Sequence, residues 1–254
     1  MRDTALLDLS GTVALVTGAS GTIGRGVALR FARAGAAVVV HGNRNPADDV
    51  ADRIRSDGGT ALAVTADLTD QQACADLVAE AASWTGRLDA LVNNAGIQPV
   101  RPLADLSATD WRTMLDTNLT SAFLCTQAAA RIMRGRGGSV SHVASIEASQ
   151  PAAGHAHYSA AKAALVMHAR AAALEYGRHG IRVNAVSPGL IDRPGLAGDW
   201  PSGVDRWQAA APLTRLGTPA DVGNACVFLA SPMASWITGH DLTVDGGVTA
   251  RPTW

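Results

Sequence analysis

The sequence predicts an α/β protein built on one doubly wound parallel sheet of about seven strands, with helices on both faces. Short apolar runs alternate with segments of helical period along the whole chain, and the first apolar run leads directly into closely spaced glycines. Strands that alternate with helices are joined by crossover connections, which favour parallel pairing. No linker or change of composition divides the chain, so we expect a single domain over residues 1–254.

Each strand is expected where β-branched and other apolar residues cluster between turn residues. Such runs cover 13–17, 37–41, 61–66, 90–93, 139–144, 181–186 and 242–245. Between them, apolar residues at helical spacing predict helices over 24–33, 46–56, 71–84, 108–134, 159–177 and 220–229. The stretch 190–212 is rich in proline and glycine and has no clear period, so we expect a substrate loop there.

The composition favours a small-molecule partner. Apolar residues make up 47% of the chain and the formal net charge is -1, so there is no broad basic field to attract nucleic acid or an anionic membrane. The first residues, MRDTALLDLSGT, include acidic side chains, and no later segment reaches the roughly 18 uncharged apolar residues of a membrane span. We therefore expect a cytoplasmic protein.

Cysteine and histidine spacing gives no metal site. Cys74, Cys125 and Cys226 are far apart and form no CxxC pair, which favours reduced packing residues over disulfides or zinc ligands. His155 and His157 are two residues apart, with no third ligand in view. We expect no bound metal.

The glycines in LVTGASGTIGRG, residues 15–26, stand where the first strand gives way to a helix. Gly18 suits a tight turn after the strand, and Gly21 and Gly24 let backbone approach a ligand closely. The helix that follows offers free N–H groups and the positive end of its dipole to a pyrophosphate. The pattern indicates a Rossmann-like dinucleotide cradle.

A second group of residues can carry acid–base chemistry. Tyr158 and Lys162 are four residues apart in a helical segment, so their side chains share one face. A fixed ammonium stabilises a phenolate, so we expect the Tyr158 pKa to fall below its usual value of about 10. Tyr158 then becomes a general acid or base. Ser145 ends the fifth strand, at the sheet edge that binds ligands, and its hydroxyl could hold the substrate oxygen.

These residues belong to a longer series of motifs: TGASGTIG at 17–24, NNAG at 93–96, Asn118, Ser145, YSAAK at 158–162 and SPG at 187–189. In this order and at this spacing, the sequence resembles the short-chain dehydrogenases/reductases over essentially its whole length, as a short-form, 3-oxoacyl-reductase-like member. The resemblance implies that Tyr158 is the catalytic acid/base and that Lys162 holds the nicotinamide ribose and tunes Tyr158. It also implies that Ser145 polarises the carbonyl and that Asn118 supports a proton relay.

The resemblance also implies a set of cofactor contacts. Asp67 would lie near the adenine, Asn93 and Asn94 near the adenosine ribose, and Pro188, Gly189 and Ile191 by the nicotinamide. The full expected set adds Tyr158 and Lys162 to Gly18, Ser20, Gly21, Thr22, Ile23, Gly24, Asn43, Arg44, Asp67, Leu68, Asn93, Asn94, Ala95, Gly96, Pro188, Gly189 and Ile191.

Two departures from the family pattern affect the expected cofactor contacts. Gly21 comes one position early and Thr22 follows it, which gives the TGxxGxxG spacing of the longer, extended branch. The chain is too short for the C-terminal substrate region of that branch, so we interpret the spacing as a local variant. Arg193 stands where many members carry a threonine after the PG segment, which puts one hydrogen bond to the nicotinamide carboxamide in doubt.

The residues after the second strand bear on the choice of dinucleotide. An Asp or Glu there binds the ribose 2′-hydroxyl of NAD and repels the 2′-phosphate of NADP. This chain has Gly42 at that position, followed by Asn43 and Arg44, and Arg44 could pair with a phosphate. NADP(H) is therefore favoured over NAD(H). The alternative is that Arg44 is a solvated loop charge, and no basic residue occupies the position of Gly21, where many NADP-preferring relatives have one.

Substrate contacts are expected from residues near Tyr158 and from the loop 190–212. The candidates are Gln98, Glu147, His155, Trp200 and Trp207, with Arg101, Gln150 and His157 as further ones. Trp200 and Trp207 could close over an apolar substrate, or could pack a short helix onto the body or onto a second subunit.

The sequence thus favours an NADP(H)-dependent oxidoreductase that interconverts a carbonyl and a secondary alcohol. The alternatives are an NAD-dependent sugar, polyol or alcohol dehydrogenase, a dinucleotide sensor without turnover, and an epimerase or lyase with transient hydride transfer. Alanine-rich helices at 108–134 and 159–177 permit close packing between subunits, and the family resemblance implies a homotetramer, with a dimer second.

Overall fold

A seven-stranded parallel sheet lies at the centre of the protein, as the sequence predicts. The computed structural model describes residues 7–250. All the strand pairs are parallel, in the order β3-β2-β1-β4-β5-β6-β7. The strands are β1 (Val13–Val16), β2 (Ala37–Gly42), β3 (Ala61–Thr65), β4 (Ala90–Asn93), β5 (Gly138–Val143), β6 (Ile181–Pro188) and β7 (Asp241–Val244).

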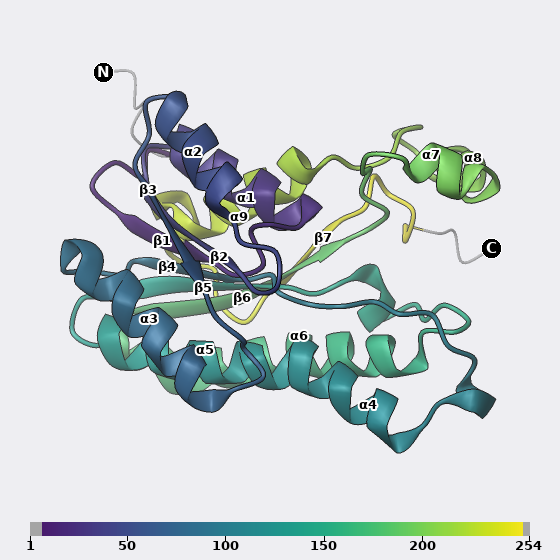
Figure 1. The fold of residues 1–254 in the computed structure, drawn as a ribbon, viewed down its shortest axis with the longest axis horizontal. Coiled ribbons are helices and arrows are strands. Elements are labelled where there is room, and N and C mark those ends of the chain that lie inside the picture. Colours follow the sequence, from purple (N-terminus) through teal and green to yellow (C-terminus); the bar gives the residue numbers. More distant parts are fainter. Residues whose placement is uncertain (1–6, 251–254) are drawn as a thin grey trace.

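Helices cover both faces of this sheet (Figure 1). One face carries α1 (Thr22–Arg33), α2 (Asp48–Ser56) and α9 (Pro219–Ala230), and the other carries α3 (Gln71–Thr85), α4 (Ala108–Leu115), α5 (Ser121–Met133) and α6 (Ala156–Tyr176). The strand order reverses between β1 and β4, which places their carboxyl ends side by side. That edge is where doubly wound sheets bind ligands.

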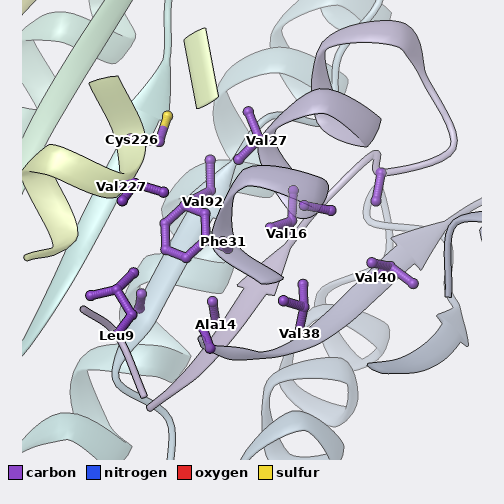
Figure 2. Close-up of a cluster of buried hydrophobic side chains, with 14 of the residues drawn as sticks. Leu9, Ala14, Val16, Val27, Phe31, Val38, Val40, Val92, Cys226 and Val227 are labelled. Carbon is purple, nitrogen blue, oxygen red and sulfur yellow. The ribbon is translucent and has the colours of Figure 1, made fainter. Parts of the chain in front are cut away.

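Two buried hydrophobic clusters hold the helices to the sheet. The cluster under α1 and α9 includes Phe31, Val27 and Val227 against the strand residues Val16 and Val92 (Figure 2). A second cluster fills the opposite face beneath α3, α5 and α6. Each fully buried side chain of this size contributes roughly 1.5–3 kcal/mol of transfer free energy, so both layers are firmly fixed.

The predicted helix over 108–134 is wrong in one respect, because it is not regular throughout. Between α4 and α5 the chain forms a π-helical segment, Asp116–Thr120. The widened turn is centred on Asn118, whose side chain bonds to backbone outside the helix. A π segment keeps a helical sequence pattern, so periodicity alone does not predict it.

The predicted loop over 190–212 is also wrong in part, because it contains α7 (Leu196–Asp199) and α8 (Pro201–Ala210). Pro201 begins α8, where its missing N–H costs nothing. Val204 and Trp207 pack with Leu196 in a small cluster separate from the main core. The two helices lie at one end of the molecule, away from the helical layers (Figure 1).

Further sequence expectations can be compared with the described residues. Cys74, Cys125 and Cys226 are buried free thiols. Over residues 7–250, no helix is both long and apolar enough to cross a bilayer. Within the same range, no three His, Cys, Asp or Glu side chains converge as metal ligands.

Candidate active site

Tyr158 and Lys162 share one buried face of α6. Their relative exposures are 9% and 4%, and Lys162 Nζ lies 5.5 Å from the centre of the Tyr158 ring. Lys162 Nζ also donates a hydrogen bond of 2.7 Å to the carbonyl of Val143, at the end of β5. The four-residue spacing therefore places both groups over the carboxyl edge of the sheet.

Ser145 lies beside Tyr158 at the same edge. It follows β5 and precedes a short 3-10 turn, Ile146–Ala148, whose Glu147 N–H donates to Ser145 Oγ at 3.1 Å. The Ser145 hydroxyl is also near enough to Tyr158 to lower the pKa of the phenol. Two hydroxyl groups from different elements thus converge where a carbonyl or alcohol oxygen could bind.

The pKa of Tyr158 departs from the expectation drawn from the sequence. Burial raises the pKa of Tyr158 to about 12; the hydrogen bond to Ser145 lowers it, and the negative charge of Glu147 raises it further. Burial also lowers the pKa of Lys162 to about 8. The expected lowering is therefore wrong for this arrangement, because loss of solvation, together with the charge of Glu147, outweighs the favourable effect of Ser145. The protonated phenol is the stable form, and it is suited to donate a proton.

Asn118 is buried in the π-helical segment, and its amide is fully engaged by backbone. Nδ2 donates to the carbonyls of Ile97 and Met114 at 3.1 Å, and Oδ1 accepts from Ile97 N–H at 3.1 Å. A Cβ at Gly96 would lie only 2.4 Å from Asn118 Oδ1. The asparagine thus ties the helix to the loop after β4, and the glycine of the NNAG motif makes room for it.

The glycine-rich loop is packed closely against the residues after β4. Gly18 has a φ of +64°, and a Cβ there would lie 2.8 Å from the Cα of Ala95. A Cβ on Gly24 would lie 2.2 Å from the Gly18 carbonyl and 2.5 Å from Asn94 Nδ2. A Cβ on Gly21, the N-cap residue of α1, would have only one neighbour within 4 Å, the Gly18 carbonyl oxygen at 3.4 Å. Close contacts therefore require glycine at positions 18 and 24, whereas position 21 has room for a Cβ.

The side chains of Asn94, Thr17 and His41 hold this loop, and His41 is the one that the sequence did not single out. Asn94 Nδ2 donates to the carbonyls of Thr17 and Gly18, and Asn94 N–H donates to Thr17 Oγ1. His41 Nδ1 accepts from Gly18 N–H at 3.1 Å, and His41 Nε2 donates to the Ala66 carbonyl at 3.0 Å. Burial lowers the pKa of His41, which favours the neutral ring that this bonding needs. In the sequence, this role could have been suspected from the polar His41 at the end of the apolar run VVVH.

Asn93 lies in a different environment from Asn94. It is buried, and its Nδ2 contacts Thr126 Oγ1 at 3.0 Å and His142 Nδ1 at 3.1 Å. His142 Nε2 in turn lies 3.1 Å from His168 Nδ1. Because the Asn93 side chain faces α5 and α6, any contact with a cofactor falls to its backbone.

Asn43, Arg44 and Asp67 come together after β2 and β3. Thr69 lowers the pKa of Asp67 through backbone and side-chain hydrogen bonds, and Arg44 and Asn43 lower it further through charge and hydrogen bonding. Asn43 and Arg44 are exposed, whereas the neighbouring Leu68 is buried. The structure therefore brings the predicted adenosine-end residues to one exposed site.

The predicted nicotinamide-end residues lie at the end of β6 and directly after it. Pro188 is the last residue of the strand, and a Cβ on Gly189 would lie 2.6 Å from the Trp207 ring. Ile191 pairs with Gly217 in an isolated bridge. Trp207 thus packs α8 onto the body, one of the two roles considered for it.

A cavity of about 1080 Å³ runs between α1, α7 and the start of α9, and Ser20, Thr22 and Arg193 are among its lining residues. Arg193 is paired with Asp199 at 2.7 Å. Ile23, by contrast, packs against the core. The glycine-rich loop and the segment after β6 therefore border one common space.

The candidate substrate residues separate into two groups. Gln98, Glu147 and His155 bond to one another beside Tyr158, together with Ser159, which the sequence did not indicate. Trp200, by contrast, is 46% exposed, and the guanidinium of Arg206, in α8, lies 5.9 Å from the centre of its ring. The first group is therefore close to the reacting groups, and Trp200 is packed within the α7–α8 segment.

Comparisons with known proteins agree on one family. The model described as Enoyl-(Acyl carrier protein) reductase matches residues 18–249. A cis-4-hydroxycyclohexanecarboxylate dehydrogenase from Sinomonas cyclohexanicum is 44% identical over 241 residues, covering 94% of this chain and 96% of the relative. An L-rhamnose 1-dehydrogenase (NAD(P)(+)) from Azotobacter vinelandii is 42% identical, covering 92% and 95%. A solved short-chain type dehydrogenase/reductase from Mycobacterium marinum superposes with a TM-score of 0.90 at 37% identity, covering 99% and 100%.

Proposed function

The chain belongs to the short-chain dehydrogenase/reductase family and is an NAD(P)-dependent oxidoreductase acting on CH–OH groups, and we propose that it prefers NADP(H) and uses Tyr158 as its acid/base. The observation that carries the assignment of Tyr158 is the convergence of its hydroxyl with Ser145 above the buried Lys162. The dehydrogenase relatives do not favour the sensor or the epimerase alternative. The 3-oxoacyl-reductase-like subtype stays a prediction.

The bare backbone of the glycine-rich loop supports dinucleotide binding. Side chains at Gly18 or Gly24 would collide with neighbouring backbone, so the loop packs tightly only because these two positions lack a Cβ. α1 begins at Thr22 with no side-chain cap and no acidic residue in its first turn, so its free N–H groups suit an anionic pyrophosphate. The bound nicotinamide would supply or accept the hydride.

Proton transfer is assigned to Tyr158. In carbonyl reduction its phenol donates a proton to the oxygen that becomes the alcohol, and the raised pKa keeps that proton in place near neutral pH. Ser145 Oγ hydrogen-bonds the same oxygen and orients it. Lys162, held by the Val143 carbonyl, stabilises the phenolate that remains after transfer.

The preference for NADP(H) is argued from the end of β2. A Cβ on Gly42 would lie 2.3 Å from the Asn45 carbonyl, so an acidic side chain that binds the 2′-hydroxyl of NAD does not fit this backbone. Arg44 is exposed nearby and can form charge-assisted hydrogen bonds with a 2′-phosphate.

A homotetramer, with a dimer second, is proposed from the outer face of α5 and α6. Phe123, Met167 and Leu174 are 42%, 58% and 87% exposed there, among small alanines. Burying these apolar side chains against a second copy would remove them from water. Light scattering on the protein as it elutes from a size-exclusion column measures the mass of the assembly, and hence the number of subunits.

Melting temperatures with NADPH and NADH at equal concentration test the dinucleotide proposal. A ligand that binds only the native state stabilises it according to its dissociation constant, so a tenfold preference adds about 1.4 kcal/mol at saturation. We expect the larger shift with NADPH. A larger shift with NADH would contradict the proposed preference, and no shift with either would contradict the cradle. Turnover of secondary alcohols is then followed by absorbance of the reduced dinucleotide.

A further inference from the structure

Four polar side chains from separate segments form one cluster beside Tyr158, here called the Glu147 cluster. Its members are Gln98 after β4, Glu147 in the turn after β5, His155 before α6, and Ser159 in α6. Glu147 Oε1 accepts from Gln98 Nε2 at 3.0 Å, and Oε2 lies 3.0 Å from His155 Nδ1 and 3.3 Å from Ser159 Oγ. The carboxylate is therefore committed to donors of the protein.

The chemistry of a carboxylate fixes the direction of these hydrogen bonds. An ionised Glu147 only accepts, so Gln98 must turn its nitrogen toward Glu147 and its oxygen away. Gln98 is exposed, and over residues 7–250 its Oε1 accepts no protein hydrogen bond. Over residues 7–250 the Glu147 cluster thus presents two acceptors without a protein partner: the oxygen of Gln98 and, when His155 Nδ1–H donates to Glu147, the Nε2 of His155. The His155 nitrogen is buried, so the oxygen of Gln98 is the exposed one.

The cluster adjoins the reacting groups. Glu147 N–H donates to Ser145 Oγ at 3.1 Å, and the His155 ring lies 6.0 Å, centre to centre, from the Tyr158 ring in an edge-to-face arrangement. A substrate held by Ser145 and Tyr158 therefore meets the Glu147 cluster next.

The charges around Gln98 disfavour an anionic substrate. An acceptor oxygen backed by the Glu147 carboxylate attracts a hydroxyl and repels a second carboxylate. Arg101, in the same loop, is already paired with Asp110 at 3.4 Å. The available interaction is therefore a neutral hydrogen bond rather than an ion pair.

We propose that the Glu147 cluster selects uncharged alcohols that carry a second hydroxyl near the reacting one, such as diols, polyols or sugars, through Gln98 Oε1. This inference rests on the proposed function, because it assumes that the alcohol reacts at Tyr158 and Ser145. A site built to bind a hydroxyl discriminates against the analogue that lacks it.

Matched pairs of alcohols test the selection. Values of kcat/KM are compared for cyclohexanol with cis-1,2-cyclohexanediol, and for 2-butanol with 2,3-butanediol, in the wild type, Gln98→Met and Gln71→Met. Methionine keeps the length of glutamine without its acceptor, and Gln71 is an exposed residue at the start of α3. We expect the wild type to favour each diol about tenfold, as one hydrogen bond supports. In Gln98→Met the ratio of diol to mono-alcohol kcat/KM should fall to about one, and this ratio is the readout, whatever the absolute rates.

The outcomes separate the two proposals. Equal turnover of mono-alcohol and diol by the wild type, or an unchanged ratio in Gln98→Met, would overturn the role of Gln98 and leave the oxidoreductase intact. No oxidation of any of the four alcohols would overturn the inference. If NADP⁺ and NAD⁺ also fail to bind, the proposed function is overturned as well. As a second variant, Glu147→Gln frees the Gln98 amide to rotate and should weaken the diol preference, whereas Gln71→Met should keep it.

Discussion

The two ends of the candidate site differ in how firmly the fold holds them. At the catalytic end, Tyr158 and Lys162 are buried at 9% and 4% exposure, and Lys162 bonds to the strand beneath it. At the adenosine end, Asn43 and Arg44 are exposed on a loop. Under the proposed function, the contrast means that packing sets the acid–base chemistry, whereas a few solvated side chains set the preference for a dinucleotide. Changes at the two ends should therefore differ in kind as well as in size.

The largest effect is expected from Tyr158→Phe. The variant removes the proton donor and keeps the buried ring, so kcat should fall about 1,000-fold or more while the dissociation constant for the dinucleotide changes little. The free energy of unfolding should change by no more than about 1 kcal/mol, because the buried ring is kept and at most one hydroxyl interaction is lost. Steady-state kinetics measure kcat, and titration with the dinucleotide measures its dissociation constant. Activity within tenfold of the wild type would remove Tyr158 from the chemistry.

Gly24→Ala should have the next largest effect, and Gly21→Ala serves as its matched control. A Cβ at Gly24 would lie 2.2 Å from the Gly18 carbonyl, whereas one at Gly21 meets nothing closer than 3.4 Å. We expect Gly24→Ala to weaken dinucleotide binding about 100-fold and to lower the free energy of unfolding by about 1–3 kcal/mol. Gly21→Ala should alter stability by less than about 0.5 kcal/mol. Calorimetric titration and urea unfolding give both values, and similar losses in the two variants would contradict the steric argument.

Local sequence pattern predicted most of the fold and indicated that Tyr158 and Lys162 share one face of a helix, but it did not predict the features that depend on packing between distant segments. The strands follow β-branched runs, and Tyr158 and Lys162 follow from helical spacing. The π segment at Asn118 and the bond from Gly18 to His41 depend on loops that meet only in the folded protein. The direction of the Tyr158 pKa was missed for the same reason, because spacing reveals the nearby lysine but not the burial of the phenol.

The pH dependence of the two reaction directions tests that burial. Oxidation needs the phenolate as base, and burial raises the pKa of Tyr158 to about 12, so the fraction of phenolate rises with pH. We expect kcat/KM for oxidation to increase by up to about tenfold per unit between about pH 6 and 8, while reduction, which uses the phenol, does not increase. Lys162 loses its charge near its lowered pKa of about 8, so the rise should be shallower at higher pH. An oxidation rate already constant at pH 7 would contradict a raised pKa.

The smallest effect is expected at the adenosine end, from Arg44→Ala. Arg44 is exposed and close to Asp67, whose charge partly offsets its own, so its contact with a phosphate is weaker than a buried pair would be. We expect the dissociation constant of NADPH to rise about five- to tenfold, that of NADH to change by less than about twofold, and the melting temperature of the free protein to stay unchanged. Arg53→Ala, which removes an exposed arginine of α2 paired with Asp57, controls for general charge. If both dinucleotides weaken equally, Arg44 does not read the phosphate, and the preference must come from a part of the site more firmly held than this loop.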